Sequence, residues 1–367
     1  MNIGVAKERT GGEQRVAIGP DSVAKLVKGG AAVLVERGAG TAAGFPDAVF
    51  EKAGATMIDD ASALYAQSAI VLRVQPPTLD ESRLLPEGSV LIASLPAATS
   101  GDLLAALAAR KITAFALEKV PRITRAQSMD MLSSQSTVSG YKAVLLGAAA
   151  LPKFLPSLTT AAGSIPPARV FVLGAGVAGL QAIATARRLG AIVSAFDVRA
   201  AAAEQVMSLG ATFVASDLVS SDAETKGGYA RAQGEEERER TLAAIARHIV
   251  DQDLVVTTAL IPGRAAPVLI TRAMVESMRP GAVIVDLAAE AGGNCELTTA
   301  GETVVVNGVS IIGAMNLPST VPYHASQMLS RNVLTLLQHL IKDNTLTIDL
   351  TDEITKAMVV THDGVVV

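Results

Sequence analysis

Three glycines are the residues whose type and spacing point most directly to chemistry. Gly174, Gly176 and Gly179 form a G-x-G-x-x-G pattern, preceded by a short β-branched run and followed by a helical pattern. In that context the first glycine permits a tight turn, the second lets a phosphate approach the backbone, and the third lets helix and strand pack closely. The helix start adds free N–H groups and the positive end of a dipole. The segment therefore predicts a pyrophosphate-binding turn, which includes Ala175 and Val177.

An acidic residue after the next strand extends this prediction. The strand expected over Ala191–Phe196 leads into Asp197, 18 residues past Gly179. A carboxylate there accepts hydrogen bonds from an adenosine ribose and repels a 2′-phosphate, so it favours NAD(H) over NADP(H). Arg199 would suit NADP(H), but we expect it to be solvated or to face the adenosine, because the acid holds the discriminating position. A glycine turn without a ligand is disfavoured, because strand, glycines, helix and acid agree.

Composition narrows the class of protein. A chain of 367 residues suits two domains, and no apolar run reaches the roughly 18 residues that cross a bilayer. The single cysteine, Cys295, excludes an internal disulfide and a multi-thiolate metal site, and the histidines lack metal-ligand spacing. A net charge of −4 and few aromatic residues argue against nucleic acid. We expect a cytoplasmic protein with no metal and no direct membrane insertion.

The elements that must position these residues alternate between strand and helix. Strands are expected at Asn2–Val5, Ala32–Glu36, Ala69–Arg73, Val90–Ala93, Thr113–Ala116, Leu254–Thr257, Ala282–Leu287, Thr303–Val306 and Ser310–Ile312. Helical patterns lie between them, and such alternation indicates mainly parallel sheets. Ser216–Arg240 breaks the pattern and is expected to run as a long polar loop, either a lid or a solvated insertion, into a helix over Glu235–Ile249.

Two long helical patterns and a terminal hairpin signal define the domains. The helical patterns cover Ser134–Leu151 and Val321–Ile341, and Asp363-Gly364 separates two apolar runs. We predict an α/β protein with two Rossmann-like, doubly wound parallel-sheet domains, joined by long helices with a cleft between them. Residues 1–133 and 320–367 would form the first domain, and residues 134–319 the NAD(H)-binding domain.

The segment Arg122–Ser136, which reads RITRAQSMDMLSSQS, is the most specific string outside the glycine turn. It resembles the signature loop of the NAD(H)-binding component of proton-translocating nicotinamide nucleotide transhydrogenase. The resemblance covers essentially the whole chain. Its other strings are Lys7-Glu-Arg, Arg15-Val-Ala, Asp197-Val-Arg, Gly227-Gly-Tyr, Thr257-Thr-Ala-Leu-Ile-Pro-Gly and Asp286-Leu-Ala-Ala-Glu-Ala-Gly-Gly-Asn.

This resemblance implies roles for individual residues. Arg122, Gln127, Asp130 and Ser133 would surround the nicotinamide, with the Gln127 amide facing the carboxamide and Asp130 fixing Arg122. Without the resemblance, the same segment is better explained as a helix-capping turn. The implied nucleotide contacts beyond the glycine turn and Asp197 are Val198, Arg199, Gly228, Tyr229, Ala259 and Leu260, with Tyr229 closing over bound nucleotide.

Alanine dehydrogenases share the fold and several of these strings, so they are the serious alternative. Oxidation of an amino acid releases a proton and needs a base, whereas hydride exchange between two nicotinamides needs none. None of the four histidines lies in the first 247 residues. Pro96 stands in the region of that family's catalytic histidine, Arg73 aligns with its substrate lysine, and Glu290 with its later aspartate. An arginine cannot shuttle a proton near neutral pH.

The resulting expectation is direct hydride transfer between NADH on this chain and NADP⁺ on a partner. One nucleotide fingerprint and no membrane span imply an NADP(H)-binding partner component and a membrane-spanning subunit, which would hold the chain at the inner (plasma) membrane. The end at Val367 fits a separate NAD(H)-binding subunit as well as a truncated one. The resemblance implies a homodimer. A non-catalytic, NAD-responsive binding module is the remaining alternative.

Overall fold

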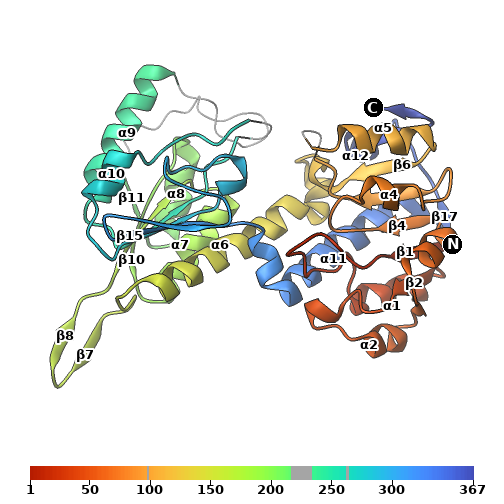
Figure 1. Ribbon diagram of the computed structural model, residues 1–367, viewed down its shortest axis with the longest axis horizontal. Helices are drawn as coiled ribbons and strands as arrows, with labels where there is room; N and C mark the ends of the chain where they lie inside the picture. Colours follow the sequence, from red (N-terminus) through yellow and green to blue (C-terminus); the bar gives the residue numbers. More distant parts are fainter. Residues whose placement is uncertain (97–98, 216–233, 262–263) are drawn as a thin grey trace. The chain divides into compact units, whose positions relative to one another are not determined.

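The computed structural model describes residues 1–96, 99–215, 234–261 and 264–367 (Figure 1). The chain forms two compact units. The first consists of Met1–Gln135 and Pro318–Val367, and the second of Ser136–Leu317. The domain boundaries expected from the sequence followed residues 133 and 319.

The first unit is built on one eight-stranded sheet. Its strand order is β19-β18-β6-β5-β4-β1-β2-β3, with all strands from β3 to β6 parallel and β18 antiparallel to β6. The bounds are β1 (Asn2–Val5), β2 (Ala32–Glu36), β3 (Thr56–Ile58), β4 (Ile70–Leu72), β5 (Val90–Ala93), β6 (Thr113–Ala116), β18 (Val359–His362) and β19 (Val365–Val366). The parallel sheet expected from the alternating pattern is confirmed.

Helices cover both faces of this sheet. They are α1 (Pro20–Lys28), α2 (Asp47–Lys52), α3 (Ala61–Gln67), α4 (Leu79–Ser82), α5 (Gly101–Ala109), α11 (Pro322–Leu340) and α12 (Glu353–Met358), with the 3-10 turns η1 (Thr41–Ala43), η2 (Leu117–Lys119) and η3 (Thr124–Met129). Ile70 and Leu72 of β4 enter one apolar cluster, and Val71 enters another. Since alternate residues of a strand point to opposite faces, both faces of the sheet are buried.

The second unit repeats this arrangement around a seven-stranded sheet. Its order is β11-β10-β9-β12-β13-β15-β14, and only β14 is antiparallel to its neighbour. The strands are β9 (Arg169–Leu173), β10 (Ile192–Phe196), β11 (Thr212–Phe213), β12 (Leu254–Thr257), β13 (Val283–Asp286), β14 (Thr303–Val306) and β15 (Val309–Gly313). The helices are α7 (Val177–Arg188), α8 (Ala200–Ser208), α9 (Glu235–Ile249) and α10 (Arg272–Ser277), with the 3-10 turns η6 (Ala289–Ala291) and η7 (Leu317–Thr320).

Two long helices were expected from the sequence, and both are present. Helix α6 (Met131–Ala150) begins in the first unit and continues into the second, while α11 lies in the first. Within the ranges that the structure describes, no helix is long and apolar enough to cross a membrane.

Three small hairpins complete the fold. The hairpin predicted at Asp363-Gly364 is confirmed, since β18 and β19 pair antiparallel and both turn residues have positive φ, 46° and 86°. The hairpin of β7 (Leu158–Thr160) and β8 (Gly163–Ile165) was not predicted, and it extends away from the sheet of its own unit (Figure 1). The third joins β16 (Ile341–Lys342) and β17 (Thr345–Leu346).

Candidate nucleotide-binding site

Each sheet has one place where the chain order reverses. In the second unit it lies between β9 and β12, and in the first between β1 and β4. Connections leave these neighbouring strands in opposite directions, and ligands of doubly wound sheets bind at the carboxyl ends there. We call these places the two switch points.

The glycine turn lies at the switch point of the second unit, directly after β9. Gly174 has φ +93°, and a Cβ on it would lie 2.7 Å from Thr258 Oγ1. A Cβ on Gly179 would lie 1.8 Å from the carbonyl oxygen of Gly174, so no side chain fits there. A Cβ on Gly176 would meet nothing within 4 Å. The protein itself therefore requires the first and third glycines, whereas the second faces open space that a phosphate can fill.

Helix α7 begins beside this open space. Its N-cap is Gly176, which supplies no side chain to cap the first turn. The N–H of Ala175 donates to Asp197 Oδ2 at 2.7 Å, and Val177 is the first helical residue. A helix N-terminus without a capping side chain is suited to an anion. The residues at this turn fit the pyrophosphate of a dinucleotide.

The carboxylate of Asp197 is surrounded by donors. Its Oδ2 accepts from Ala175 N at 2.7 Å and from Arg199 Nη2 at 2.8 Å. Its Oδ1 accepts from the backbone N and the Nε of Arg199, both at 2.9 Å. The expected solvated or adenosine-facing side chain of Arg199 is therefore wrong for this structure. Asp197 is buried, and a buried carboxylate requires a counter-charge, which the residue two positions on supplies.

The loop after β12 completes this switch point. Thr258 Oγ1 donates to the carbonyl oxygen of Gly174 at 2.9 Å, which fixes the loop against the glycine turn. Asn294 holds Ala259 from both sides, accepting from its N–H and donating to its carbonyl oxygen, each at 2.9 Å. Leu260 is 46% exposed. Val198 packs against the apolar cluster on one face of the sheet.

Asp286 acts at one remove from this loop. It is fully buried, and its carboxylate accepts from the N–H groups of Ala288, Asn294 and Cys295 and from the hydroxyls of two threonines, Thr257 and Thr298. A carboxylate with all its acceptor positions used is structural, as expected. Sequence reasoning missed the role of Asn294, although it stands in the Gly292-Gly293-Asn294 string.

The segment with the proposed nicotinamide residues lies in the first unit. Asp130 caps helix α6, accepting from Ser133 N at 2.8 Å and from Ser133 Oγ at 2.5 Å. Arg122 and Gln127 are exposed. The structure thus brings Asp130 and Ser133 together as a helix cap and leaves the Gln127 amide open to solvent, where a ligand can reach it.

Residues from distant parts of the sequence fix this segment. Asn332 Nδ2 donates to Ser128 O at 2.8 Å, and Ser134 Oγ donates to Asn332 Oδ1 at 2.7 Å. Arg125 Nη2 bonds Asp352 Oδ2 at 2.7 Å. The backbone around Gln127 is thereby held in place from α11 and from the start of α12.

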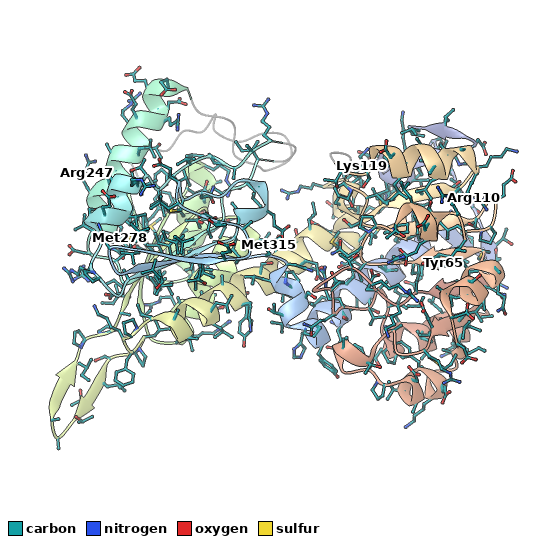
Figure 2. The ribbon with its side chains drawn as sticks, viewed as in Figure 1. Tyr65, Arg110, Lys119, Arg247, Met278 and Met315 are labelled. Atoms are coloured by element: carbon teal, nitrogen blue, oxygen red, sulfur yellow. The ribbon has the colours of Figure 1, made fainter. Side chains whose placement is uncertain are left out.

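The switch point of the first unit is filled by an ion-pair cluster. Arg73 is 1% exposed, and its guanidinium lies 2.7 Å from Glu81 Oε2, 3.4 Å from Glu8 Oε2 and 3.0 Å from Tyr65 OH, inside the unit (Figure 2). Burial favours the neutral form, but the charges of Glu8 and Glu81 and the phenol of Tyr65 keep the pKa of Arg73 above its usual value. Burial raises the pKa of Glu8, against the pull of Arg73. A guanidinium so engaged has little left for a substrate carboxylate.

A neighbouring buried group joins this cluster. Burial opposes ionisation of Glu13, yet its bonds to Arg15 and Gln75 lower its pKa to about 2. Arg15 also donates to Gln135 Oε1 at 2.9 Å. The Arg15-Val-Ala string is thus tied to the start of α6.

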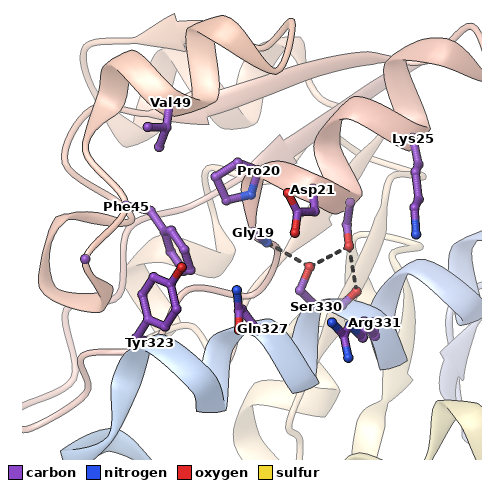
Figure 3. Close-up of a pocket in the computed structure, with 12 residues that line it drawn as sticks. Gly19, Pro20, Asp21, Lys25, Phe45, Val49, Tyr323, Gln327, Ser330 and Arg331 are labelled. Atoms are coloured by element: carbon purple, nitrogen blue, oxygen red, sulfur yellow. Dashed lines mark hydrogen bonds between the residues drawn. The ribbon is translucent and has the colours of Figure 1, made fainter.

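Two predicted residues and a separate cavity remain to be placed. Gly228 and Tyr229 lie outside the residues that the structure describes. A cavity of about 310 Å³ opens between α1 and α11, lined partly by Phe45, Tyr323 and Arg331 (Figure 3), and none of the predicted site residues lines it. In the described ranges of the chain, no cluster of three or more His, Cys, Asp or Glu side chains has metal-binding geometry.

Comparison with known proteins agrees with this geometry. The family models "Alanine dehydrogenase/PNT, N-terminal domain" and "Alanine dehydrogenase/PNT, C-terminal domain" match residues 4–139 and 143–367. The chain is 50% identical to the first of the polypeptides that make up the NAD(P) transhydrogenase alpha subunit of Rhodospirillum rubrum, covering 100% of this chain and 98% of the relative. It is 34% identical to an alanine dehydrogenase of Halomonas elongata, over 91% of this chain and 86% of that one.

A solved structure agrees as well. The transhydrogenase from Sinorhizobium meliloti matches with a TM-score of 0.90 at 44% identity, over 100% of both chains. The fold and site therefore define a two-unit nicotinamide-nucleotide protein of the alanine dehydrogenase/PNT class. The chain belongs to that family, and within it is homologous to the alpha subunit of NAD(P) transhydrogenase, which confirms the resemblance carried by Arg122–Ser136.

Proposed function

We propose that this chain is the NAD(H)-binding component of a proton-translocating transhydrogenase and acts only together with an NADP(H)-binding partner. The observation that carries the proposal is the contrast between its two switch points. The one in the second unit has an open glycine turn and an acid, whereas Arg73 and its carboxylates close the one in the first unit. The chain therefore offers a site for a dinucleotide and none for a small acidic co-substrate.

The chemistry needs positioning more than proton transfer. A hydride passes from a reduced to an oxidised nicotinamide, and no proton is released. The protein's part is to hold one ring so that the reacting carbons come within about 3–3.5 Å. We assign ring positioning to Gln127 and Arg122, which are exposed, with Asp130 and Ser133 fixing the backbone beside them. NAD(H) itself would be held by the glycine turn, Asp197–Arg199, Ala259 and Leu260, with Gly228 and Tyr229 contributing from outside the described residues.

Partners follow from the same proposal. The Rhodospirillum rubrum relative is named as one portion of an alpha subunit, which supports companion polypeptides for this chain. We propose an NADP(H)-binding component and a membrane-spanning subunit that couples hydride transfer to proton movement. We further propose a homodimer that is peripheral to the inner membrane through these partners.

An alanine dehydrogenase-like activity is the second candidate, favoured by the 34% identity to a named alanine dehydrogenase. The side chains of the first unit argue against it. Arg73 is buried among Glu8, Glu81 and Tyr65 and cannot act as a base. An assay with NAD⁺ and alanine should give no turnover above background, and robust turnover would replace our proposal with this one.

The deciding experiment measures binding and transfer together. Purified chain should bind NADH far better than NADPH in calorimetry and should transfer hydride to NADP⁺ only when a purified NADP(H)-binding partner is present. Asp197→Ala should weaken NADH binding by roughly 1–3 kcal/mol, the cost of unpaired polar groups. Glu276→Ala, on the exposed surface of α10, is the matched control.

Three outcomes separate the alternatives. Equal affinity for NADH and NADPH would refute the role of Asp197. NADH binding without transfer in the presence of an active partner would favour the NAD-responsive binding module. Transfer with strict NADH preference would support the transhydrogenase component.

A further inference from the structure

The acceptor capacity of Asp197 is fully used by the protein itself. An ionised carboxylate has about four lone-pair positions. Here the four are taken by Ala175 N, Arg199 N, Arg199 Nε and Arg199 Nη2, at 2.7–2.9 Å. Ribose hydroxyls can therefore bind Asp197 only where another donor leaves.

The two kinds of donor differ in their freedom to leave. The N–H groups of Ala175 and Arg199 belong to the backbone of the glycine turn and of the N-cap of α8, so they are fixed. The Nε and Nη2 groups belong to a side chain that is 16% exposed and can rotate outward. Two exchangeable side-chain donors thus occupy the positions that the two hydroxyls of an adenosine ribose need.

The same pair changes the charge that a 2′-phosphate would meet. A lone carboxylate repels a phosphate, but an Asp–Arg pair at 2.8 Å is close to neutral. Arg199 also places a guanidinium, a good phosphate ligand, beside the ribose position.

We propose that Arg199 is a specificity-determining residue that lowers the preference of this site for NADH over NADPH. It does so by competing with ribose hydroxyls for Asp197 and by screening the carboxylate from a 2′-phosphate. This inference rests on the proposed NAD(H) site and extends it, because it assigns opposite effects on the two nucleotides to one side chain.

The test compares three variants by calorimetric titration with NADH and NADPH at low ionic strength. Arg199→Ala should bind NADH about fivefold more tightly, because the ion pair no longer has to be broken. It should bind NADPH about fivefold or more weakly, because the acid is then unscreened. Arg188→Ala removes the same charge from the exposed last turn of α7 and should change neither affinity.

Arg199→Lys keeps the charge but cannot bracket both carboxylate oxygens with a planar fork. It should bind NADH with intermediate affinity and NADPH nearly as the unaltered protein does. If Arg199→Ala fails to fold in a thermal melt, the lysine variant carries the test.

The outcomes distinguish this inference from the proposed function. If the unaltered protein does not bind NADH, the proposed function fails. If it binds NADH and the Arg199 variants bind NADH with unchanged or lower affinity, the proposed function stands and the role of Arg199 is overturned. If NADH binding tightens but NADPH binding does not weaken, the screening role is overturned.

Discussion

Asn332 and Ser128 are 204 positions apart in the sequence and are joined by a hydrogen bond of 2.8 Å, from the side-chain amide of Asn332 to the carbonyl oxygen of Ser128. The same amide accepts from Ser134 Oγ at 2.7 Å. One side chain of α11 therefore holds the backbone on both sides of the proposed nicotinamide residues.

Replacing Asn332 by Asp should slow hydride transfer more than it weakens NADH binding. The aspartate keeps an acceptor for Ser134 but turns an oxygen toward Ser128 O, so the segment shifts. Since a displacement of about 1 Å can cost on the order of a hundredfold in rate, we expect at least about a tenfold loss. Stopped-flow transfer measured beside equilibrium NADH binding checks this, with Thr335→Ala on the exposed side of α11 as the control. Equal losses of rate and binding would contradict a positioning role.

Gly176→Ala and Gly179→Ala should separate ligand binding from folding. Gly179→Ala places a methyl group 1.8 Å from a carbonyl oxygen and should lower the free energy of unfolding by about 1–3 kcal/mol or more. Gly176→Ala meets nothing within 4 Å and should cost less than about 1 kcal/mol, yet weaken NADH binding strongly. Urea denaturation and NADH titration of both variants check the pair. Unimpaired NADH binding by Gly176→Ala would mean that no phosphate approaches that glycine.

Gln127→Asn should separate rate from affinity in the same way, but through a ligand-facing side chain. The shorter amide no longer reaches the carboxamide in register, so the ring is misplaced while the contacts at Asp197 and the glycine turn remain. We expect strongly reduced hydride transfer to the partner's NADP⁺ with NADH binding nearly intact. Rapid-mixing kinetics and calorimetry on one preparation decide it. Loss of both in equal measure, or of neither, would remove Gln127 from the ring-positioning residues.

Glu13 should make the first unit acid-sensitive over a definite range. Its pKa is about 2 in the folded protein and near 4.5 in its unperturbed form, so its ionised state stabilises the fold. That contribution is fully present above about pH 4.5 and is lost as the pH falls towards 2. Because Glu13 is buried, the loss is on the order of 3 kcal/mol. Urea unfolding of the unaltered chain and of Glu13→Gln, from pH 6 downward, should show this loss only in the former. An unchanged pH profile in Glu13→Gln would show that Glu13 does not contribute.

Local patterns in the sequence were sufficient for most of the fold. The strands β1, β2, β5 and β6 lie at their expected bounds, because short apolar runs between turn residues specify buried parallel strands. The terminal hairpin follows from Asp363-Gly364, whose side chains tolerate positive φ. The β7–β8 hairpin could not be predicted, because its strands have three residues each, are largely exposed and show no apolar alternation.

The site was predictable only in part, for a physical reason. The glycine turn and Asp197 depend on local spacing, which a sequence displays. The anchoring amides of Asn294 and Asn332 act on backbone atoms 35 and 204 positions away, so their roles become visible only in the fold. The pairing of Arg199 with Asp197 is local, yet the sequence leaves the rotamer of an arginine open, and burial of the acid decides it.

The loop after β12 also gives this chain a means of optical readout. The sequence has no tryptophan, so a single one introduced at Leu260 would be the sole indole in the protein. Leu260 is largely exposed, and its neighbour Ala259 is clamped by Asn294, so the new ring would sit on a fixed base beside the glycine turn. Reduced nicotinamide absorbs light where indole emits and its oxidised form does not. The emission of that one residue would therefore report the redox state of whatever nucleotide the turn holds.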